Sequence, residues 1–349
     1  MPSLLTAIDL FAGAGGLSEG LRQAGFDVRA AVELDHTSAS SYRLNHGRTK
    51  LKLADIRKVT GPALLKLARL RRGELSLLTG CPPCQGFSSL QRRRSHVGAE
   101  DPRNELVFEV LRLVRSLRPA AVVMENVPGL KDNYRFDRFS MGLKASGYSF
   151  EFSIINAKDF GVPQRRKRLV LIAFRDAAVP QGWAQHRSPI CTVRDAISSL
   201  PKAGQSGDPL HDYPERRSAR VLSRIEATPI DGGSRKDIPA ELGCDCHESS
   251  DGYHDVYGRM SWDAESPTIT SGCTNPSKGR FIHPEENRAI TLREAALLQS
   301  FPLRYLFDLS RGKEHVALQI GNAFPPRLIR PIARTIRTTL KTCYGQKDA

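Results

Sequence analysis

The sequence predicts an α/β fold with a doubly wound parallel sheet, because β-like runs alternate with helical patterns over the first half of the chain. The expected strands are short apolar runs at residues 4–11, 28–34, 51–56, 75–80, 120–126, 148–155 and 168–174. Helical stretches are expected between them at 17–24, 62–72 and 104–117. These stretches end at Gly25, at Gly73 and before Pro119, and such residues are common stop signals for helices.

Beyond residue 176 the composition changes, and a second, loop-rich unit is expected. Residues 176–290 are rich in Pro, Gly, Ser, Asp and Arg, with short β-like pieces such as 266–270. A last helical region at 326–340 is apolar at helical spacing and should pack back on the sheet. At about 150 residues per domain, the 349 residues fit either two domains or one large α/β unit with an insert.

Composition places the chain among globular proteins. Forty per cent of the residues are hydrophobic, and the mean hydropathy is −0.36. No apolar run approaches the roughly 18–20 residues that a membrane span requires, and the N-terminus lacks the pattern of a signal peptide. The seven cysteines are an odd number, which favours reduced thiols in a cytoplasm over a disulfide framework.

The charge balance indicates a polyanionic partner. Lys and Arg number 52 against 37 Asp and Glu, so the net charge is +15 and the isoelectric point lies near 9.7. Such a surplus attracts nucleic acid. The positive residues also cluster, at 91–96, at 164–168 and at Arg216–Arg217.

Three expected strand ends carry residues suited to an adenosine-containing cofactor. The first strand runs into the glycine-rich turn DLFAGAGGLSEG (9–20), where Ser18 stands in place of the third glycine of a dinucleotide fingerprint. The NAD pattern therefore fails, although the turn still lets a ligand approach the backbone. Glu33 closes the second strand and could accept hydrogen bonds from ribose hydroxyls. Asp55-Ile56 closes the third, with a carboxylate for an adenine amine and an apolar wall for its ring.

Two further strand ends carry reactive groups. Cys84 in GCPPCQGFSS (80–89) follows the fourth strand and faces a polar, basic segment, which makes it a candidate nucleophile. A Cys81–Cys84 redox pair and a buried structural cysteine are the alternatives. Glu125 ends the fifth strand after an apolar run, so partial desolvation should favour its holding a proton. The alternative for Glu125 is a helix cap or a loop carboxylate.

Six segments in order resemble the motifs of the DNA cytosine-5 methyltransferases. They are DLFAGAGG, PPCQGFS, ENVPG, QRRKR (164–168), REAALLQSFP (293–302) and QIGNAFPP (319–326). The resemblance spans residues 7 to about 335 and leaves a variable stretch between about 180 and 255. It implies a Rossmann-like methyltransferase sheet that binds S-adenosyl-L-methionine, formed by 1–180 plus 316–349. A target-recognition domain at 181–315 would be inserted near the C-terminus.

The resemblance also implies roles for particular residues. The Cys84 thiolate would add to C6 of cytosine, and Glu125 would hydrogen-bond N3 and the exocyclic amine. At least one of Arg166 and Arg168 should reach the cytosine O2 or the catalytic loop. The cofactor-binding set is Asp9, Phe11, Gly13, Gly15, Gly16, Leu17, Glu33, Asp55, Ile56, Pro82, Leu106 and Asn322. The DNA-binding set is Gln85, Ser88, Arg92, Arg93, Arg94, Arg216, Arg217 and Arg235, with the base readers concentrated in 210–240.

This chemistry cannot take place inside a stacked duplex, so the target base should be flipped out into the pocket. The expected partners are double-stranded DNA and a cognate restriction endonuclease, with the chain itself a monomer in a bacterial cytoplasm. No candidate emerges for the base that removes the C5 proton.

Three alternatives stay open at this point. The enzyme could methylate tRNA, as some relatives with PPCQ and ENV do, although the long variable insert favours duplex DNA. The chain could instead be a catalytically silent DNA-binding module. Cys244, Cys246, His247 and Cys273 could bind zinc, but their spacing matches no standard pattern, so no metal is expected.

Overall fold

The computed structural model describes residues 5–83, 101–243 and 255–344. The chain divides into two compact units. Unit 1 comprises 1–160, 167–187 and 324–349, and unit 2 comprises 161–166 and 188–323. No helix within the described ranges is long and apolar enough to cross a membrane.

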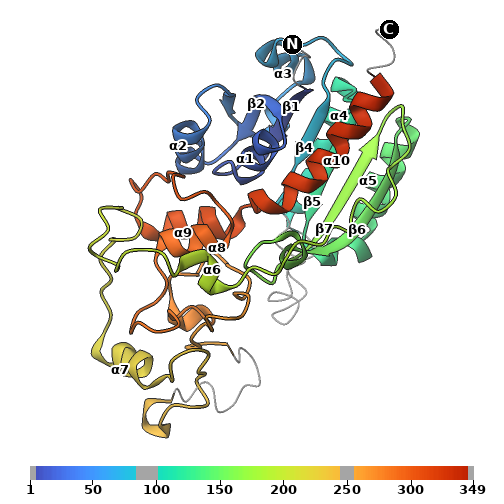
Figure 1. Cartoon of the computed structure of the whole chain (residues 1–349). Coiled ribbons are helices and arrows are strands. Elements are labelled where there is room, and N and C mark those ends of the chain that lie inside the picture. The colour runs from blue at the N-terminus through green and yellow to red at the C-terminus, as the bar shows by residue number, and fades with distance from the viewer. Residues whose placement is uncertain (1–4, 84–100, 244–254, 345–349) are drawn as a thin grey trace. The chain divides into compact units, whose positions relative to one another are not determined.

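Unit 1 contains a seven-stranded sheet in the order β3-β2-β1-β4-β5-β7-β6 (Figure 1). The strands are β1 (Leu5–Leu10), β2 (Phe26–Glu33), β3 (Lys50–Leu53), β4 (Leu77–Gly80), β5 (Ala121–Asn126), β6 (Ser149–Asn156) and β7 (Lys167–Phe174). All seven expected strands are confirmed to within a few residues. Strands β3, β2, β1, β4 and β5 are parallel, so their carboxyl ends lie at one edge of the sheet.

The expectation of an all-parallel sheet is wrong at one strand. β7 runs antiparallel to both β5 and β6. Residues 157–166, which join β6 to β7, contain only the short 3₁₀ turn η5 (Ala157–Phe160). A parallel return would need a crossover of a dozen or more residues, so the chain turns back beside β6 instead.

Helices cover both faces of this sheet. They are α1 (Gly16–Gln23), α2 (His36–Asn45), α3 (Gly61–Ala68), α4 (Leu106–Leu117), α5 (Tyr134–Ala145) and α10 (Pro326–Tyr344). One face carries α3, α4 and α5, whose apolar side chains form a cluster with alternate strand residues such as Ile8, Leu10 and Val122. The other face carries α2, whose Tyr42 packs on Ala12 and Ala31.

The last helix packs back on unit 1, as the sequence predicts. α10 lies against α1, and Gly20 of α1 allows the close approach. A Cβ added at Gly20 would collide with the Pro326 carbonyl and the Ile329 side chain. The buried side of α10 carries Leu328, Ile329, Ile332, Ala333, Ile336 and Leu340.

Unit 2 is loop-rich, with short helices. They are α6 (Val193–Ile197), α7 (Ala219–Ala227), α8 (Leu292–Leu298) and α9 (Lys313–Asn322). In the described residues the other 3₁₀ turns are η1 (Ile56–Lys58), η3 (Pro102–Glu105), η4 (Pro128–Asp132), η6 (Ala240–Leu242) and η8 (Pro276–Lys278). The β-like piece at 266–270 is not a strand, since only Ser266 forms an isolated bridge, with Gln164.

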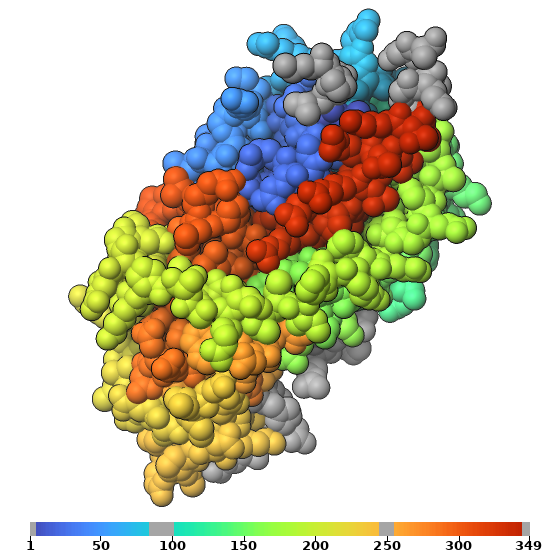
Figure 2. All heavy atoms as spheres, in the orientation of Figure 1, coloured from blue at the N-terminus to red at the C-terminus, as the bar shows by residue number. Residues whose placement is uncertain are grey.

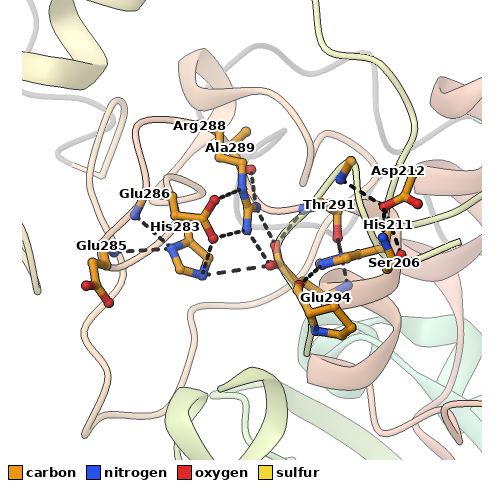
Figure 3. Close-up of polar contacts among 12 residues, drawn as sticks. Ser206, His211, Asp212, His283, Glu285, Glu286, Arg288, Ala289, Thr291 and Glu294 are labelled. Carbon is orange, nitrogen blue, oxygen red and sulfur yellow. Dashed lines mark hydrogen bonds and ion pairs between the residues drawn. The ribbon is translucent and has the colours of Figure 1, made fainter. Parts of the chain in front are cut away.

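A polar network holds the core of unit 2 (Figure 3). Thr291 caps α8, and its backbone N–H donates to the Glu294 carboxylate at 2.7 Å. The same carboxylate accepts two bonds of 2.8 Å from Arg288. His211 contacts the Thr291 hydroxyl at 2.8 Å. The REAALLQSFP motif therefore contributes a buried capping residue, Glu294, to the frame of unit 2.

Candidate active site

The carboxyl ends of the parallel strands place most of the predicted cofactor residues at one edge of the sheet in unit 1, whereas Leu106 begins α4 and Asn322 lies in unit 2. Leu10 of β1 pairs with both Val32 and Gly80, and Glu33 pairs with Leu53. The segments that follow β1, β2, β3 and β4 therefore leave the sheet side by side. This edge is where ligands bind in open α/β sheets.

The turn after β1 adopts a backbone that favours glycine. Gly13 has φ 54° and Gly15 has φ 96°, and Gly15 caps the N-terminus of α1. A Cβ at Gly13 would meet nothing within 4 Å, so open space lies beside this part of the turn. Phe11 also has a positive φ of 57° and is half-buried.

Glu33 ties this turn to the end of β2. Its carboxylate accepts a bond of 2.7 Å from the Gly13 N–H, and bonds of 2.9 and 2.8 Å from the N–H groups of Leu34 and Asp35. Desolvation raises the pKa of Glu33, and the three backbone donors oppose that rise.

Asp55 lies at the end of β3 in a different setting. It caps η1 and forms an ion pair of 2.6 Å with Arg57, whose hydrogen bonds lower the pKa of Asp55 to about 2. Ile56 beside it is buried. An ionised carboxylate and an apolar side chain therefore stand together at this strand end.

Asp9 is buried beneath the turn. It accepts 2.6 Å and 3.0 Å bonds from the hydroxyls of Ser18 and Thr79, and Ser18 also contacts the Tyr42 hydroxyl at 2.8 Å. Desolvation raises the pKa of Asp9 to about 7. The Asp9 carboxylate, on β1, is thus hydrogen-bonded to Thr79 of β4 and to Ser18 of α1.

Sequence reasoning missed the α2 residues that support the turn. Tyr42 closes the Asp9 network, and His46 hydrogen-bonds the backbone of Gly15. Burial lowers the pKa of His46 to about 4. The one local signal for α2 is Asp35, whose side chain caps the helix by accepting from Ser38 N–H at 2.7 Å.

At the end of β5, Glu125 forms an ion pair with Arg168 of β7. The Arg168 Nε lies 2.8 Å from Glu125 Oε1, and the two side chains are 15% and 12% exposed. Glu125 of β5 pairs with Val170 of the antiparallel strand β7. Arg168 lies two residues before Val170, and its side chain therefore reaches the Glu125 carboxylate. The pair places an oriented anion at the ligand-binding edge.

Cys81 lies beside this pair. Gly80 pairs with Met124, so Cys81 and Glu125 leave the sheet together, and their side chains are hydrogen-bonded. Desolvation, together with the nearby charges of Glu125 and Asp9, raises the pKa of the Cys81 thiol. Asn126 binds the Pro82 carbonyl at 3.1 Å and fixes the same segment. Cys81 is therefore held as a protonated thiol, a poor nucleophile.

Arg166 and Arg168 occupy different environments, although the sequence groups them. Arg166 belongs to unit 2, is 3% exposed, and donates to the carbonyls of Ile269 and Ala323 at 3.1 and 3.3 Å. Its bonds therefore hold the unit 2 backbone, whereas Arg168 orients Glu125 in unit 1.

The other residues of the predicted cofactor-binding set differ in exposure and position. Pro82 is buried, Leu106 is half-buried at the start of α4, and Asn322 is exposed at the end of α9 in unit 2. Gly16 and Leu17 begin α1. The proposed nucleophile and part of the DNA-binding set lie outside the described residues, namely Cys84, Gln85, Ser88, Arg92, Arg93 and Arg94.

The remaining predicted DNA-binding residues lie in unit 2. Arg216 is exposed, whereas Arg217 contacts Glu215 and the Thr274 carbonyl at 2.5 Å each. The Nη1 atom of Arg235 is buried with no hydrogen-bond partner in the described part of the chain. Arg224, also within 210–240, is 7% exposed and donates to the Leu242 carbonyl, which is a structural contact.

The zinc alternative involves Cys273 and three residues, Cys244, Cys246 and His247, that lie outside the described ranges. Cys273 is fully buried, which raises the pKa of its thiol to about 12.

The mixed seven-stranded sheet of unit 1, with its glycine-rich turn after β1, has the fold of the methyltransferases. Residues 5–338 match the family model described as C-5 cytosine-specific DNA methylase. The chain belongs to this family, as the six motifs predict, and it is a DNA (cytosine-5)-methyltransferase.

Relatives along the whole chain support this assignment. The chain is 39% identical to the type II methylase M.HgiDII of Herpetosiphon aurantiacus, covering 97% of each protein. It is 33% identical to the type II methyltransferase M1.HphI of Haemophilus parahaemolyticus, covering 95% of this chain and 86% of that one.

Solved structures share the fold. The crystal structure of a prophage-encoded E. coli protein, titled as a DNA modification methyltransferase, matches with a TM-score of 0.70 and 25% identity. That match covers 97% of this chain and 99% of the other. The Dnmt2 methyltransferase of S. pombe matches with a TM-score of 0.68, 18% identity and the same coverage, which shows a common fold.

Proposed function

We propose that this enzyme transfers a methyl group from S-adenosyl-L-methionine to C5 of a cytosine in a specific duplex DNA sequence. The reaction would pass through a covalent bond between Cys84 and C6 of a flipped-out base. The single observation that carries the proposal is the Glu125–Arg168 pair, a carboxylate oriented at 2.8 Å by a guanidinium at the ligand edge of the sheet.

The residues at the strand ends suit the cofactor. Glu33 would hold the ribose hydroxyls, Asp55 the adenine amine and Ile56 the adenine ring. The open space beside Gly13 and the N-terminus of α1 at Gly15 leave room for a ligand against the backbone. When bound, S-adenosyl-L-methionine supplies an electrophilic methyl group on a sulfonium.

The chain's own groups would activate the base. C5 of cytosine is a weak nucleophile, and addition of the Cys84 thiolate to C6 makes C5 an enamine-like carbon. Glu125 would hydrogen-bond N3 and the exocyclic amine, and Arg168 would keep its carboxylate aimed at that edge. After C5 is methylated, loss of the C5 proton and of the Cys84 thiolate restores the aromatic ring.

The setting of Cys81 supports Cys84 as the nucleophile of the two. Desolvation and then the charges of Glu125 and Asp9 raise the pKa of the Cys81 thiol, which also hydrogen-bonds Glu125. Nucleophilic attack requires a thiolate. Cys84 is the second thiol of the CPPC segment (81–84), and we assign the reactive role to it.

Sequence reading would belong to unit 2. Arg216 is exposed and can bind phosphate or a base edge. Arg235 is half-buried and its buried Nη1 atom has no acceptor in the described chain, so it would read DNA only once that atom becomes accessible. The family model that matches the chain is described as a DNA methylase, which favours duplex DNA over tRNA. The two relatives named above are a type II methylase and a type II methyltransferase, which favours a role beside a cognate restriction endonuclease. We expect the enzyme to act as a monomer.

The test is methyl transfer from labelled S-adenosyl-L-methionine to duplex plasmid DNA and to bulk tRNA, side by side. The proposal requires 5-methylcytosine in the DNA digest, at one recurring sequence in methylation-sensitive sequencing, and none above background in tRNA. Methylation confined to tRNA, or methylation at adenine or at the cytosine amine, would overturn it.

A further inference from the structure

α10 carries a straight row of positive side chains. Arg327, Arg330, Arg334, Arg337 and Lys341 are spaced by three and four residues in turn, which places them on one side of the helix. The apolar residues of α10 lie on the other side and are buried in unit 1. We call the five residues the α10 row; at 1.5 Å per residue they span roughly 21 Å.

Three residues of the row have no carboxylate partner in the described chain. The helix sequence, PRLIRPIARTIRTTLKTCY, contains no Asp or Glu. In the described chain no carboxylate pairs with Arg330, Arg334 or Lys341. Desolvation and then the charges of Arg334 and Arg327 lower the pKa of Arg330, so the row is electrostatically self-repelling. Such repulsion costs free energy in the protein alone and is relieved when an anion binds along the row.

The row is accessible. Arg327, Arg334 and Lys341 are exposed, and Arg330 and Arg337 are half-buried, with Arg337 donating to the Ala24 carbonyl at 3.4 Å. Figure 2 shows α10, in red, at the surface of the molecule along its length. The threonines beside the row bond their own helix, as Thr335 does to the Pro331 carbonyl and Thr342 to the Thr338 carbonyl.

We propose that the α10 row binds the phosphate backbone of duplex DNA independently of sequence, as a second DNA contact outside the predicted reading and catalytic residues. It goes beyond the proposed function because it needs neither the cofactor nor a target cytosine. Duplex DNA carries one negative charge per roughly 1.7 Å of its axis, so several phosphates lie within reach of a 21 Å row. An acidic protein is a poorer fit, since the row offers no apolar or aromatic anchor such as the centre of a protein interface uses.

The test compares two triple variants of the full-length enzyme. The row variant is Arg330→Gln, Arg334→Gln, Lys341→Gln. The control variant is Lys66→Gln, Arg138→Gln, Lys144→Gln, which removes the same three charges from α3 and α5 on the other face of the sheet. All three control residues are exposed. Equal thermal melting temperatures, and equal kcat at saturating target DNA, establish that both variants are folded.

Binding to a random-sequence duplex is measured by fluorescence anisotropy between about 50 and 200 mM salt. The row variant should flatten the slope of log Kd against log salt by roughly 2–3, near 0.9 per lost phosphate contact, and weaken binding at least about tenfold. The control variant should change the slope by less than about one.

Two results would overturn the proposal. An unchanged slope in the row variant would exclude a phosphate contact, including the case in which the row instead binds an acidic protein. Equal losses in both variants would show that net charge alone, and not this row, governs binding.

Discussion

Glu125 and Arg168 reach each other because β7 runs antiparallel to β5, which brings the start of β7 beside the carboxyl end of β5. The 2.8 Å contact holds the Oε1 atom of a largely buried carboxylate. In a parallel arrangement the same arginine would begin its strand at the opposite edge of the sheet. The antiparallel strand is thus what orients the carboxylate of Glu125, the residue for which we propose a catalytic role.

Arg168→Ala should therefore lower kcat by about 100-fold with a smaller change in KM for DNA, because the carboxylate loses the donor that aims it. Glu125→Gln should cost at least as much. The matched control is Arg29→Ala, which removes an exposed ion pair with Asp27 of 3.0 Å and should leave kcat within about twofold. Steady-state methyl transfer measures all three; full activity in Arg168→Ala would show that Glu125 needs no partner.

The two cysteines of the CPPC segment should behave oppositely. Cys84→Ser should abolish methyl transfer, by about 1,000-fold or more, while cofactor and DNA binding persist, because a hydroxyl is a far weaker nucleophile. Cys81→Ser should keep most activity, since a hydroxyl can still donate to Glu125. Loss of turnover in Cys81→Ser alone would reverse the assignment of the nucleophile.

Cofactor affinity should depend on the strand-end carboxylates. Glu33→Ala and Asp55→Ala should each weaken S-adenosyl-L-methionine binding by about 1–3 kcal/mol, the cost of leaving a polar partner unpaired. Calorimetry with Asp27→Ala as the control measures this. Unchanged affinity in both variants would place the cofactor elsewhere.

Acid should weaken the fold through His46. Its folded pKa, about 4, lies below the ordinary 6.5, so the folded protein keeps this imidazole neutral while the unfolded chain takes up a proton. The contribution of His46 to the free energy of unfolding is complete above about pH 6.5. It falls by up to about 3 kcal/mol as the pH falls toward 4. The stability advantage of the wild type over His46→Gln in urea unfolding should shrink accordingly between pH 7.5 and 4.5.

Comparing variants cancels the contributions of other groups, including Asp9, whose pKa is raised to about 7 and whose effect has the opposite sign. His36→Gln, at an exposed position of the same helix, is the control. A pH-independent difference between wild type and His46→Gln would contradict the buried, neutral imidazole.

The effect of a substitution within 210–240 should depend on whether the side chain contacts DNA or the protein backbone. Arg216→Ala and Arg235→Ala should relax specificity at single positions, by roughly 1–3 kcal/mol each, or weaken binding to all sequences if they contact phosphate. Arg224→Ala should instead lower the melting temperature, because Arg224 binds the Leu242 and Gly243 carbonyls. Methylation sequencing of each variant distinguishes these results, and an unchanged target at every position would place the readers elsewhere.

The strands were predictable because apolar runs bounded by turn residues are a local signal, and all seven are present. The helices α2, α5, α6, α7, α8 and α9 were not predicted. α2 is rich in Ser and Thr, whose side chains favour caps and turns, so its helical pattern is weak. α5 has a clearer signal in Asn133, whose side chain accepts from the Arg135 N–H at 3.0 Å, and in the spacing of Phe136, Phe139 and Leu143.

Strand direction and side-chain partners depend on tertiary contacts that no local pattern encodes. The reversal of β7 follows from the short connection at 157–166. Arg166 and Arg168 are two residues apart, yet they belong to different compact units. The sequence predicts Asp9 as a cofactor-binding residue at the end of the first strand. In the structure Asp9 is 1% exposed, and its carboxylate is hydrogen-bonded to Ser18 and Thr79.

The most direct test of the account is to trap the covalent bond between enzyme and base. A duplex carrying the methylated sequence with 5-fluorocytosine at the target position keeps the adduct, because fluorine cannot leave C5 as the proton does. With S-adenosyl-L-methionine present, we predict a denaturant-stable complex in which fragment mass spectrometry places the nucleotide on Cys84, and no complex with Cys84→Ser. A modified Cys81, or no covalent complex under conditions in which ordinary cytosine is methylated, would contradict the proposed mechanism.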